Sequence, residues 1–296
     1  MAAFSTLYGE VCEQLHDSSA AMVTRAKEWI NFAQQEVATA AFWPWLLEID
    51  AIATDADVTT GTAAVANGDA TVTITATPTT MPNGQWFFQV AGDTYWYPVA
   101  SRTDATDFEL VVAYQGDTDP VAEYTLRHLT YSLPSDVWAI ADIRDQNQPN
   151  MLRYASHKTV DLLDIANDQS GTDTFLYIPV GADSSGYPQV MFYPPRVAAG
   201  VFLIRYYKIL ADLSNDADIP KIPAPYHKLL VYRALIDGFR FLDDGQRQSE
   251  AAQEYGFRLR EMKMHNMAPP DAGTVLGRSL YEYPRSILSQ LTLPVT

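Results

Sequence analysis

The sequence predicts an α+β protein, with a helical bundle formed by the N- and C-terminal helices, an irregular β region and an inserted small antiparallel β-sandwich or barrel domain. Apolar residues recur at helical spacing near the N-terminus and again after residue 225, whereas residues 51–126 contain short alternating runs rich in Thr, Val, Ala and Gly. We expect residues 1–47 and 209–267 to form the bundle, 48–129 the inserted module, 130–208 the second β region and 268–296 an extended docking arm.

Two helices are predicted to open the chain. The first covers roughly residues 4–16, and residues 17–19 (Asp-Ser-Ser) then provide a break and an N-cap for the second. Pro44 ends the second helix. Its predicted apolar stripe consists of Met22, Ala26, Trp29, Ala33, Val37 and Ala40.

The middle of the chain is predicted to be β-structure. In the inserted module, Val72 and Ile74 share one face of a strand, and turn dipeptides such as Asn67-Gly68 and Asn83-Gly84 recur along the segment. In the second β region, PQVMFYPP and GVFLIRYYKIL are expected to be two strands on either side of Pro194-Pro195.

Helices return after Pro225, and Gly245 separates two of them. The second runs to about residue 266, where Pro269 and Pro270 follow. The first presents Tyr226, Leu229, Leu230, Arg233, Ile236 and Phe239 on adjacent faces, and the second Ala252, Tyr255, Leu259 and Met262. The tail is predicted to be a partner-binding arm, the alternative being a C-terminal strand packed on its own domain; its apolar residues are Leu280, Tyr281, Tyr283, Ile287, Leu288 and Leu291.

Charge and composition argue against several classes of protein. The formal charge of −16 disfavours a protein that grips phosphates, and residues 51–126 contain ten acidic side chains and one basic one. Such a surface serves solubility, or it forms a wall past which DNA slides without sticking. Cys12 is the only cysteine, so no intrachain disulfide or cysteine-based zinc cage is expected. No apolar run approaches the roughly 20 residues of a membrane span, and no signal peptide is expected.

Asp216 and Asp218, in the stretch NDADIPKIPAPYHKLL, are the first candidates for a metal site. An EF-hand loop that starts at Asp212 fails at Ala217 and Pro223, where glycine and glutamate are required. A calcium site of another kind remains an alternative to a solvated turn. We interpret the prolines that follow as a stiff lead-in to the next helix.

Other candidate groups do not form a recognisable pattern. The pairs Asp55 with Asp57 and Asp117 with Asp119 are interpreted as solvated turn residues, Cys12 as a buried thiol and His227 as a surface or interface residue. The five histidines lack zinc spacing. We therefore predict no catalytic, cofactor-binding or metal-binding residue and no enzyme, although a glycosidase carboxylate pair stays open.

The order of several segments resembles the head-to-tail adaptor proteins of tailed bacteriophages, akin to the tail tubular protein A family of T7-like podophages. The segments are RAKEWINFAQQEV with FWPW, YSLPSDVWAI, YPQVMFYPPRVAAGVFLIRYYK, DIPKIPAPYHKLLVYRAL and EYGFRLREM. They cover about residues 20–47 and 130–266. The inserted segment is similar to small β modules of phage tail and neck proteins.

This resemblance implies a structural virion protein of the neck, made in the cytoplasm of the bacterial host. It implies a dodecameric homo-oligomer ring that binds the portal protein and the tail nozzle or tail tube protein. Genomic DNA would pass through its lumen during ejection without specific binding, and no membrane and no cofactor would be involved. The alternative is a phage tail accessory, a receptor-binding or carbohydrate-binding protein that uses the β module.

Overall fold

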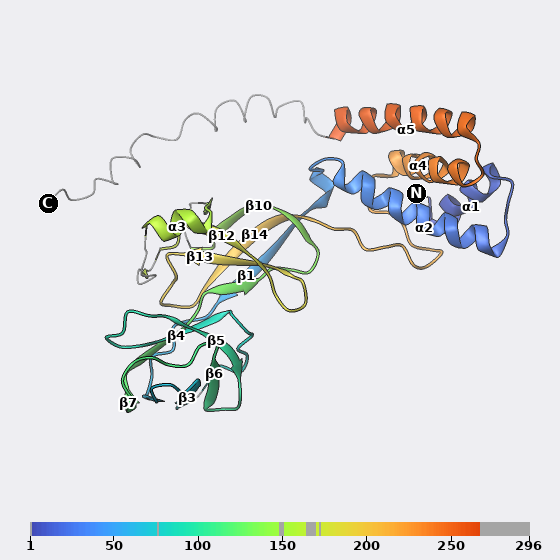
Figure 1. Cartoon of the computed structure of the whole chain (residues 1–296). Helices are drawn as coiled ribbons and strands as arrows, with labels where there is room; N and C mark the ends of the chain where they lie inside the picture. The colour runs from blue at the N-terminus through green and yellow to red at the C-terminus, as the bar shows by residue number, and fades with distance from the viewer. Residues whose placement is uncertain (1, 76, 148–150, 164–169, 172, 267–296) are drawn as a thin grey trace, which may run out of the picture. The chain divides into compact units, whose positions relative to one another are not determined.

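The structure is a computed structural model that describes residues 2–75, 77–147, 151–163, 170–171 and 173–266 (Figure 1). The chain divides into two compact units. Unit 1 contains Met1–Leu47 and Ile209–Thr296, and unit 2 contains Glu48–Lys208. The predicted mixed α+β class is confirmed.

Unit 1 is built from helices that come from both ends of the chain. They are α1 (Phe4–Gln14), α2 (Ala20–Thr39), α4 (His227–Phe241) and α5 (Gly245–Asn266). Helix α4 packs against α1, α2 and α5, and α1 also packs against α2. A Cβ atom at Gly238 would lie 2.7 Å from Leu15 Cδ1, so a side chain at this position would make Leu15, at the end of α1, shift.

Helix α2 begins where the sequence predicts, because the Ser19 hydroxyl accepts a hydrogen bond from the Met22 N–H at 3.3 Å. Its buried face differs from the predicted stripe. Ile30 is fully buried, whereas Trp29 is half-buried and its ring lies 6.3 Å from that of Phe241. The helix ends at Thr39, before Pro44, and the indole N–H of the buried Trp43 donates to the Val37 carbonyl at 2.7 Å.

Helices α4 and α5 meet at a short polar corner. Asp243 has a left-handed φ of 57°, and Asp244 Oδ1 accepts a hydrogen bond from the Arg247 N–H at 3.1 Å in the first turn of α5. Leu229, Leu230 and Phe239 are buried as predicted, whereas Ile236 is only partly buried. Gly245 is the first residue of α5, so its place between the two helices is confirmed.

The inserted module of unit 2 is a nearly closed seven-stranded sheet. Its strands are β2 (Ala63–Val65), β3 (Thr71–Ile74), β4 (Trp86–Val90), β5 (Tyr97–Arg102), β6 (Asp107–Leu110), β7 (Asp119–Ala122) and β8 (Tyr124–His128). Their order is β7-β2-β3-β6-β5-β4-β8, and neighbouring strands pair antiparallel. The two edge strands, β7 and β8, follow one another directly in sequence.

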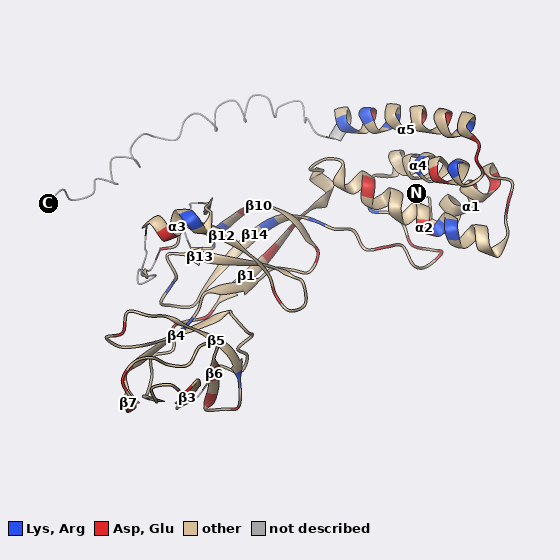
Figure 2. Cartoon of the chain, viewed as in Figure 1, with Lys and Arg blue, Asp and Glu red and all other residues tan. Residues whose placement is uncertain are grey.

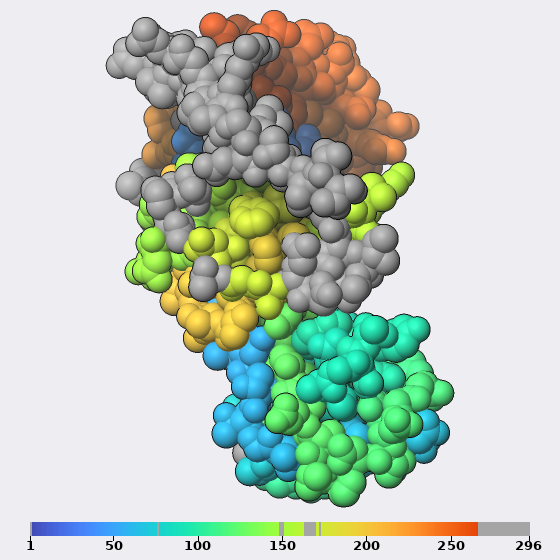
Figure 3. All heavy atoms as spheres, turned by 90° about the vertical axis from the view of Figure 1, so that its left-hand side faces the viewer, coloured from blue at the N-terminus to red at the C-terminus, as the bar shows by residue number. Residues whose placement is uncertain are grey.

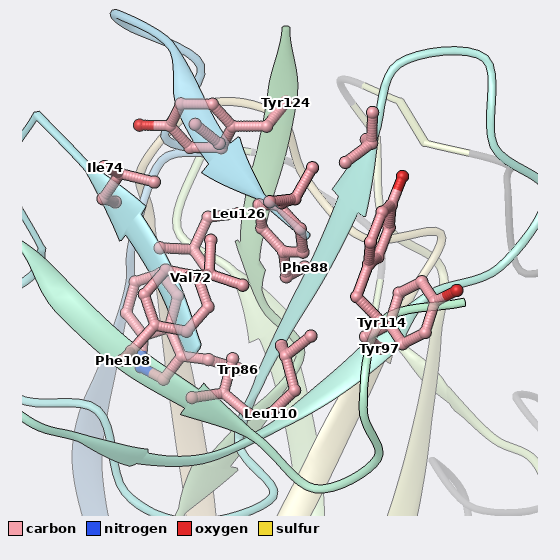
Figure 4. Packing of buried hydrophobic residues seen from close by; sticks show 14 of the residues in the cluster. Val72, Ile74, Trp86, Phe88, Tyr97, Phe108, Leu110, Tyr114, Tyr124 and Leu126 are labelled. Carbon is pink, nitrogen blue, oxygen red and sulfur yellow. The ribbon is translucent and has the colours of Figure 1, made fainter. Parts of the chain in front are cut away.

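Inward-facing side chains fill this sheet (Figure 4). Val72 and Ile74 both point into the core, as their alternation predicts, and the rings of Phe88 and Phe108 meet edge to face at 5.5 Å. In Figure 3 the atoms of the module, coloured from blue through cyan to green, form one rounded body. The module therefore has a hydrophobic core of its own.

The rest of unit 2 consists of two further sheets. One has the order β1-β14-β10, from β1 (Leu47–Thr54), β14 (Gly200–Lys208) and β10 (Val137–Asp145). The other has the order β11-β12-β13-β9, from β11 (Arg153–Tyr154), β12 (Leu176–Ala182), β13 (Pro188–Tyr193) and β9 (Thr130–Ser132). The predicted strands on either side of Pro194-Pro195 are β13 and β14.

Both sheets contribute to one core, in which the rings of Phe192 on β13 and Phe202 on β14 stack at 4.1 Å. Two features of this region are not predicted from the sequence. Helix α3 (His157–Leu163) lies within the β region, and residues 47–54, most of which were expected in the module, form β1 beside β14.

Replacing Phe88 with Ala is expected to destabilise the module by about 3–5 kcal/mol, because the fully buried ring leaves a cavity among Phe108, Tyr124 and their neighbours. The measurement is a urea titration of the full chain, followed by tryptophan fluorescence. Val112→Ala, at an exposed residue of the same module, serves as the control and should change the free energy of unfolding by less than about 0.5 kcal/mol. Equal effects of the two substitutions would contradict this core assignment.

Candidate assembly surfaces

The aspartates of NDADIPKIPAPYHKLL have partners within the protein. Asp216 Oδ1 lies 2.8 Å from Lys27 Nζ, and hydrogen bonds from Lys27 and then Tyr8 lower the pKa of Asp216. Asp218 Oδ2 accepts hydrogen bonds from the backbone N–H groups of Ser214 and Asn215, both at 2.8 Å, and these bonds lower its pKa. Among the residues that the structure describes, no three His, Cys, Asp or Glu side chains are placed to hold a metal ion.

His227 is buried, which corrects its interpretation as a surface or interface residue. Its Nε2 lies 2.8 Å from the Ile222 carbonyl oxygen, and its Nδ1 accepts a hydrogen bond from the Ala2 N–H at 3.2 Å. The imidazole therefore joins the start of the chain to the segment that precedes α4. Cys12 is also buried, as expected.

Asp57 is not a solvated residue as interpreted from the sequence, because its side chain is buried, whereas Asp55 is exposed; both contact side chains at the end of β8. Asp57 forms a buried bidentate ion pair with Arg127, with Oδ2 2.6 Å from Nη2 and Oδ1 3.0 Å from Nε. Asp55 Oδ2 lies 2.7 Å from Nδ1 of His128. The chain enters the module beside Asp55 and Asp57 and leaves it at Arg127 and His128.

Backbone hydrogen bonds complete this junction, which we call the stem and define by Asp55, Asp57, Val58, Leu126, Arg127 and His128. Val58 and Leu126 exchange both N–H···O bonds at 2.9 Å. A comparable pair joins the ends of unit 2, since Lys208 forms an ion pair with Glu48. An ion pair thus joins the two ends of the module, and another joins the two ends of unit 2.

Aromatic rings enclose His128. Its imidazole stacks on Trp86 at 4.6 Å between centroids and lies 4.2 Å from the ring of Tyr131. Burial lowers the pKa of His128, and the hydrogen bond to Asp55 opposes this effect. Arg127 also lies over the ring of Trp96, with Cζ 4.7 Å from the centroid. Stacking and charge together fix the last residues of β8.

A polar network joins three helices of unit 1. Arg233 on α4 lies 2.7 Å from both Glu36 on α2 and Asp237, and the hydroxyl of Tyr255 on α5 donates to Glu36 at 2.9 Å. Burial raises the pKa of Tyr255, and the adjacent Glu36 raises it further. The hydroxyl therefore stays protonated and keeps donating at neutral pH.

Exposed aromatic rings lie beside this network. About half of Phe32 and of Phe241 is exposed, at 55% and 51%. The guanidinium of Arg233 lies 5.1 Å from the centroid of Phe32, and that of Arg25 lies 4.0 Å from Phe241. Arg25, Trp29, Phe32, Arg233 and Phe241 form what we call the aromatic–arginine surface. Aromatic and arginine side chains are the residues that most often dominate protein–protein interfaces.

Unit 2 contains a cleft of about 580 Å³ along two strand edges, which we call the β1–β9 cleft. Ile52, Tyr131 and Leu133, which belong to the core between the two sheets, reach its surface. Asp183 at its rim accepts hydrogen bonds from the Tyr187 N–H at 2.9 Å and from the Ser132 hydroxyl at 2.8 Å, and these lower its pKa. The remaining lining residues are Asp50, Ala51, Ala53, Pro82, Gln85, His128, Ser132, Pro134, Ser184 and Ser185.

The predicted docking residues in the C-terminal arm lie outside the described residues, so the structure does not place them. They are Leu280, Tyr281, Tyr283, Ile287, Leu288 and Leu291. The stem, the aromatic–arginine surface and the β1–β9 cleft were not predicted from the sequence. No helix within the described ranges is both long enough and apolar enough to cross a membrane.

Comparison with known proteins finds one match to a family. A sequence model described as SU10 adaptor protein matches residues 117–275. The matched range includes strands β7 to β14 and helices α3 to α5, and it leaves out α1, α2, β1 and most of the module. No curated protein matches the chain.

Replacing Arg127 with Met is expected to destabilise unit 2 by about 3–5 kcal/mol, because the buried Asp57 carboxylate then has no counter-charge. The double variant Arg127→Met, Asp57→Leu should recover most of this loss. Chemical denaturation of the parent chain, of Arg127→Met, of Asp57→Leu and of the double variant gives the coupling energy of the pair. The half-exposed pair of Arg205 and Asp142, treated in the same way, should contribute about 0–1 kcal/mol. Similar coupling energies for the two pairs would rule out a special role of the stem.

Stability is expected to fall as the pH drops below about 6.5, through the stem histidine. The pKa of His128 is lowered in the folded chain, so below the ordinary histidine pKa the unfolded chain binds more protons than the folded chain. Protonation then favours unfolding, and His128→Gln should lose less stability than the parent chain between about pH 7.5 and 5. Thermal melting across this range measures the difference, with His157→Gln at an exposed position as the control. Parallel curves for the parent and His128→Gln chains would refute the prediction.

Proposed function

Residues 117–275 make up more than half of the chain, which therefore belongs to the SU10 adaptor protein family, and on this basis we propose that it forms a head-to-tail adaptor ring in the phage neck. The family is one of structural phage adaptors, so the chain is a structural virion component that associates with other neck proteins. The family match is the observation that carries the proposal.

In this proposal, a dodecameric ring joins the portal to the tail nozzle, and genomic DNA passes through its lumen. The helices of unit 1 would form a bundle that packs against neighbouring subunits, with the aromatic–arginine surface as one contact. The finer likeness to the tail tubular protein A of T7-like phages belongs to the same proposal. No catalytic step is assigned to any residue.

The distribution of charge supports passage of DNA without binding. Unit 2 has 8 basic and 20 acidic residues, a formal charge of −12, whereas unit 1 has 12 basic and 16 acidic residues, a formal charge of −4. Lys and Arg lie along α5 in Figure 2, and few are seen on the strands of the module. Carboxylates that line a channel repel the phosphate backbone, so they would keep DNA from sticking to the wall.

The C-terminal arm would reach the portal or an adjacent subunit of the ring. We assign this role to the apolar residues between Leu280 and Leu291, which follow α5 in the sequence. Apolar side chains along a tail suit a segment that docks on a partner.

Electron microscopy of the purified chain mixed with the portal protein should show twelvefold rings. A chain truncated after residue 267 should keep its melting temperature, because the arm lies beyond α5, but should lose most of its portal binding in a pull-down assay. Trimers that bind glycans would favour the tail-accessory alternative instead. Unchanged portal binding by the truncated chain would show that the arm does not attach the ring.

A further inference from the structure

Two sheets of unit 2 end in edge strands that line the same cleft, although at the start of β9 the Thr130 N–H already donates to the Gln85 carbonyl oxygen. Strand β1 has β14 as its one neighbour in the first sheet order, and β9 has β13 as its one neighbour in the second. Residues of both strands line the β1–β9 cleft: Asp50 to Ala53 from β1, and Tyr131 and Ser132 from β9. An open edge presents backbone N–H and C=O groups that can pair with another strand.

The edge of β1 is suited to such pairing. The Ala51 N–H donates to the Asp50 carboxylate, with N and Oδ1 2.7 Å apart, and an added strand would have to replace this local bond if it paired there. Ile49 and Ala51 are exposed on the outer face, whereas Ile52 is buried in the core that the cleft reaches. An added strand could therefore bond to the backbone of β1 and place alternate side chains on Ile52, Tyr131 and Leu133.

We propose that the β1–β9 cleft receives residues 286–293 of a second copy of this chain as an added β-strand. The inference rests on the proposed ring, and it names the surface that one subunit offers to the arm of the next. An arm that leaves one subunit and binds a different surface on the next makes a head-to-tail contact, which is the kind of contact that closes into rings.

The sequence of the arm singles out this occupant. SILSQLTL is eight residues long, as is β1, and contains no charge, proline or glycine. In an extended chain one face would carry Ile287, Ser289, Leu291 and Leu293, and the other Ser286, Leu288, Gln290 and Thr292, so three of the four apolar residues would share a face. Arg285 immediately precedes the segment, and Asp50 and Asp183 line the cleft, so a basic residue would meet an acidic rim.

The length of the chain permits the contact. Nineteen residues, 267–285, separate the end of α5 from the segment, and extended they span up to roughly 60 Å. Helix α5 of the subunit that donates the segment therefore need not end beside the cleft. A neighbouring subunit of the ring can deliver it.

The experiment uses full chains with single substitutions, one of them carrying a size tag. Ala51→Cys and Gln290→Cys chains are mixed and treated with a short flexible bismaleimide. Mass spectrometry then identifies peptides that join positions 51 and 290 of different chains. We expect about tenfold more of this product than from either control mixture, because binding holds the two thiols at a high effective concentration. One control pairs Val112→Cys, at an exposed module residue, with Gln290→Cys, and the other pairs Ala51→Cys with Thr274→Cys. The natural Cys12 is buried and common to all chains.

A second variant tests the segment without touching either folded unit. Leu291→Asp with Leu293→Asp, added to the Gln290→Cys chain, should abolish the selective product while leaving the melting temperature unchanged. Yields that match the controls would overturn the inference. If twelvefold rings form with the portal protein but the selective 51–290 cross-link is missing, the adaptor proposal stands and the arm binds elsewhere. If both the rings and the cross-link are missing, both proposals fail.

Discussion

The buried ion pair between Arg127 and Asp57 holds the module in place. A guanidinium and a carboxylate that are both removed from water stabilise a fold only when each satisfies the other, and these two meet in a bidentate geometry. Neighbouring groups depend on the pair: the Val58–Leu126 backbone bridge, the contact of His128 with Asp55 and the stacking of His128 on Trp86 all lie within two residues of its members. Strand β8 ends at His128 and β9 begins at Thr130, so the stem also fixes the start of β9, an edge strand of the four-stranded sheet.

Local patterns predicted the elements well, because their determinants are near in sequence. Ser19 caps α2, Gly245 separates α4 from α5, and the strands on either side of Pro194-Pro195 appear where alternation indicates. What could not be predicted depends on contacts between distant residues. Ile30 rather than Trp29 is buried because α1 and α4 cover that face of α2. The burial of Asp57 depends on its ion pair with Arg127, which is 70 residues away in the sequence. His227 bonds to Ala2 across 225 residues, a relation that no local spacing reveals.

The two units differ in the chemistry they offer to partners. Unit 1 presents aromatic rings with guanidinium groups above them, a combination that gains energy when water is removed. Unit 2 presents an excess of carboxylates and two strand edges, which offer backbone hydrogen bonds whatever the side chains of the partner. A single chain thus combines a surface that depends on side-chain identity with one that depends on extended conformation.

The Val58–Leu126 bridge matters for the evolution of the module as well as for its stability. Because residues 58 and 126 are hydrogen-bonded neighbours, the 67 residues between them leave and rejoin the rest of unit 2 at one point. A gene segment that encodes a body attached in this way can be lost, gained or exchanged while the host strands keep their register. The module's surface can then diverge without altering the sheets that carry it.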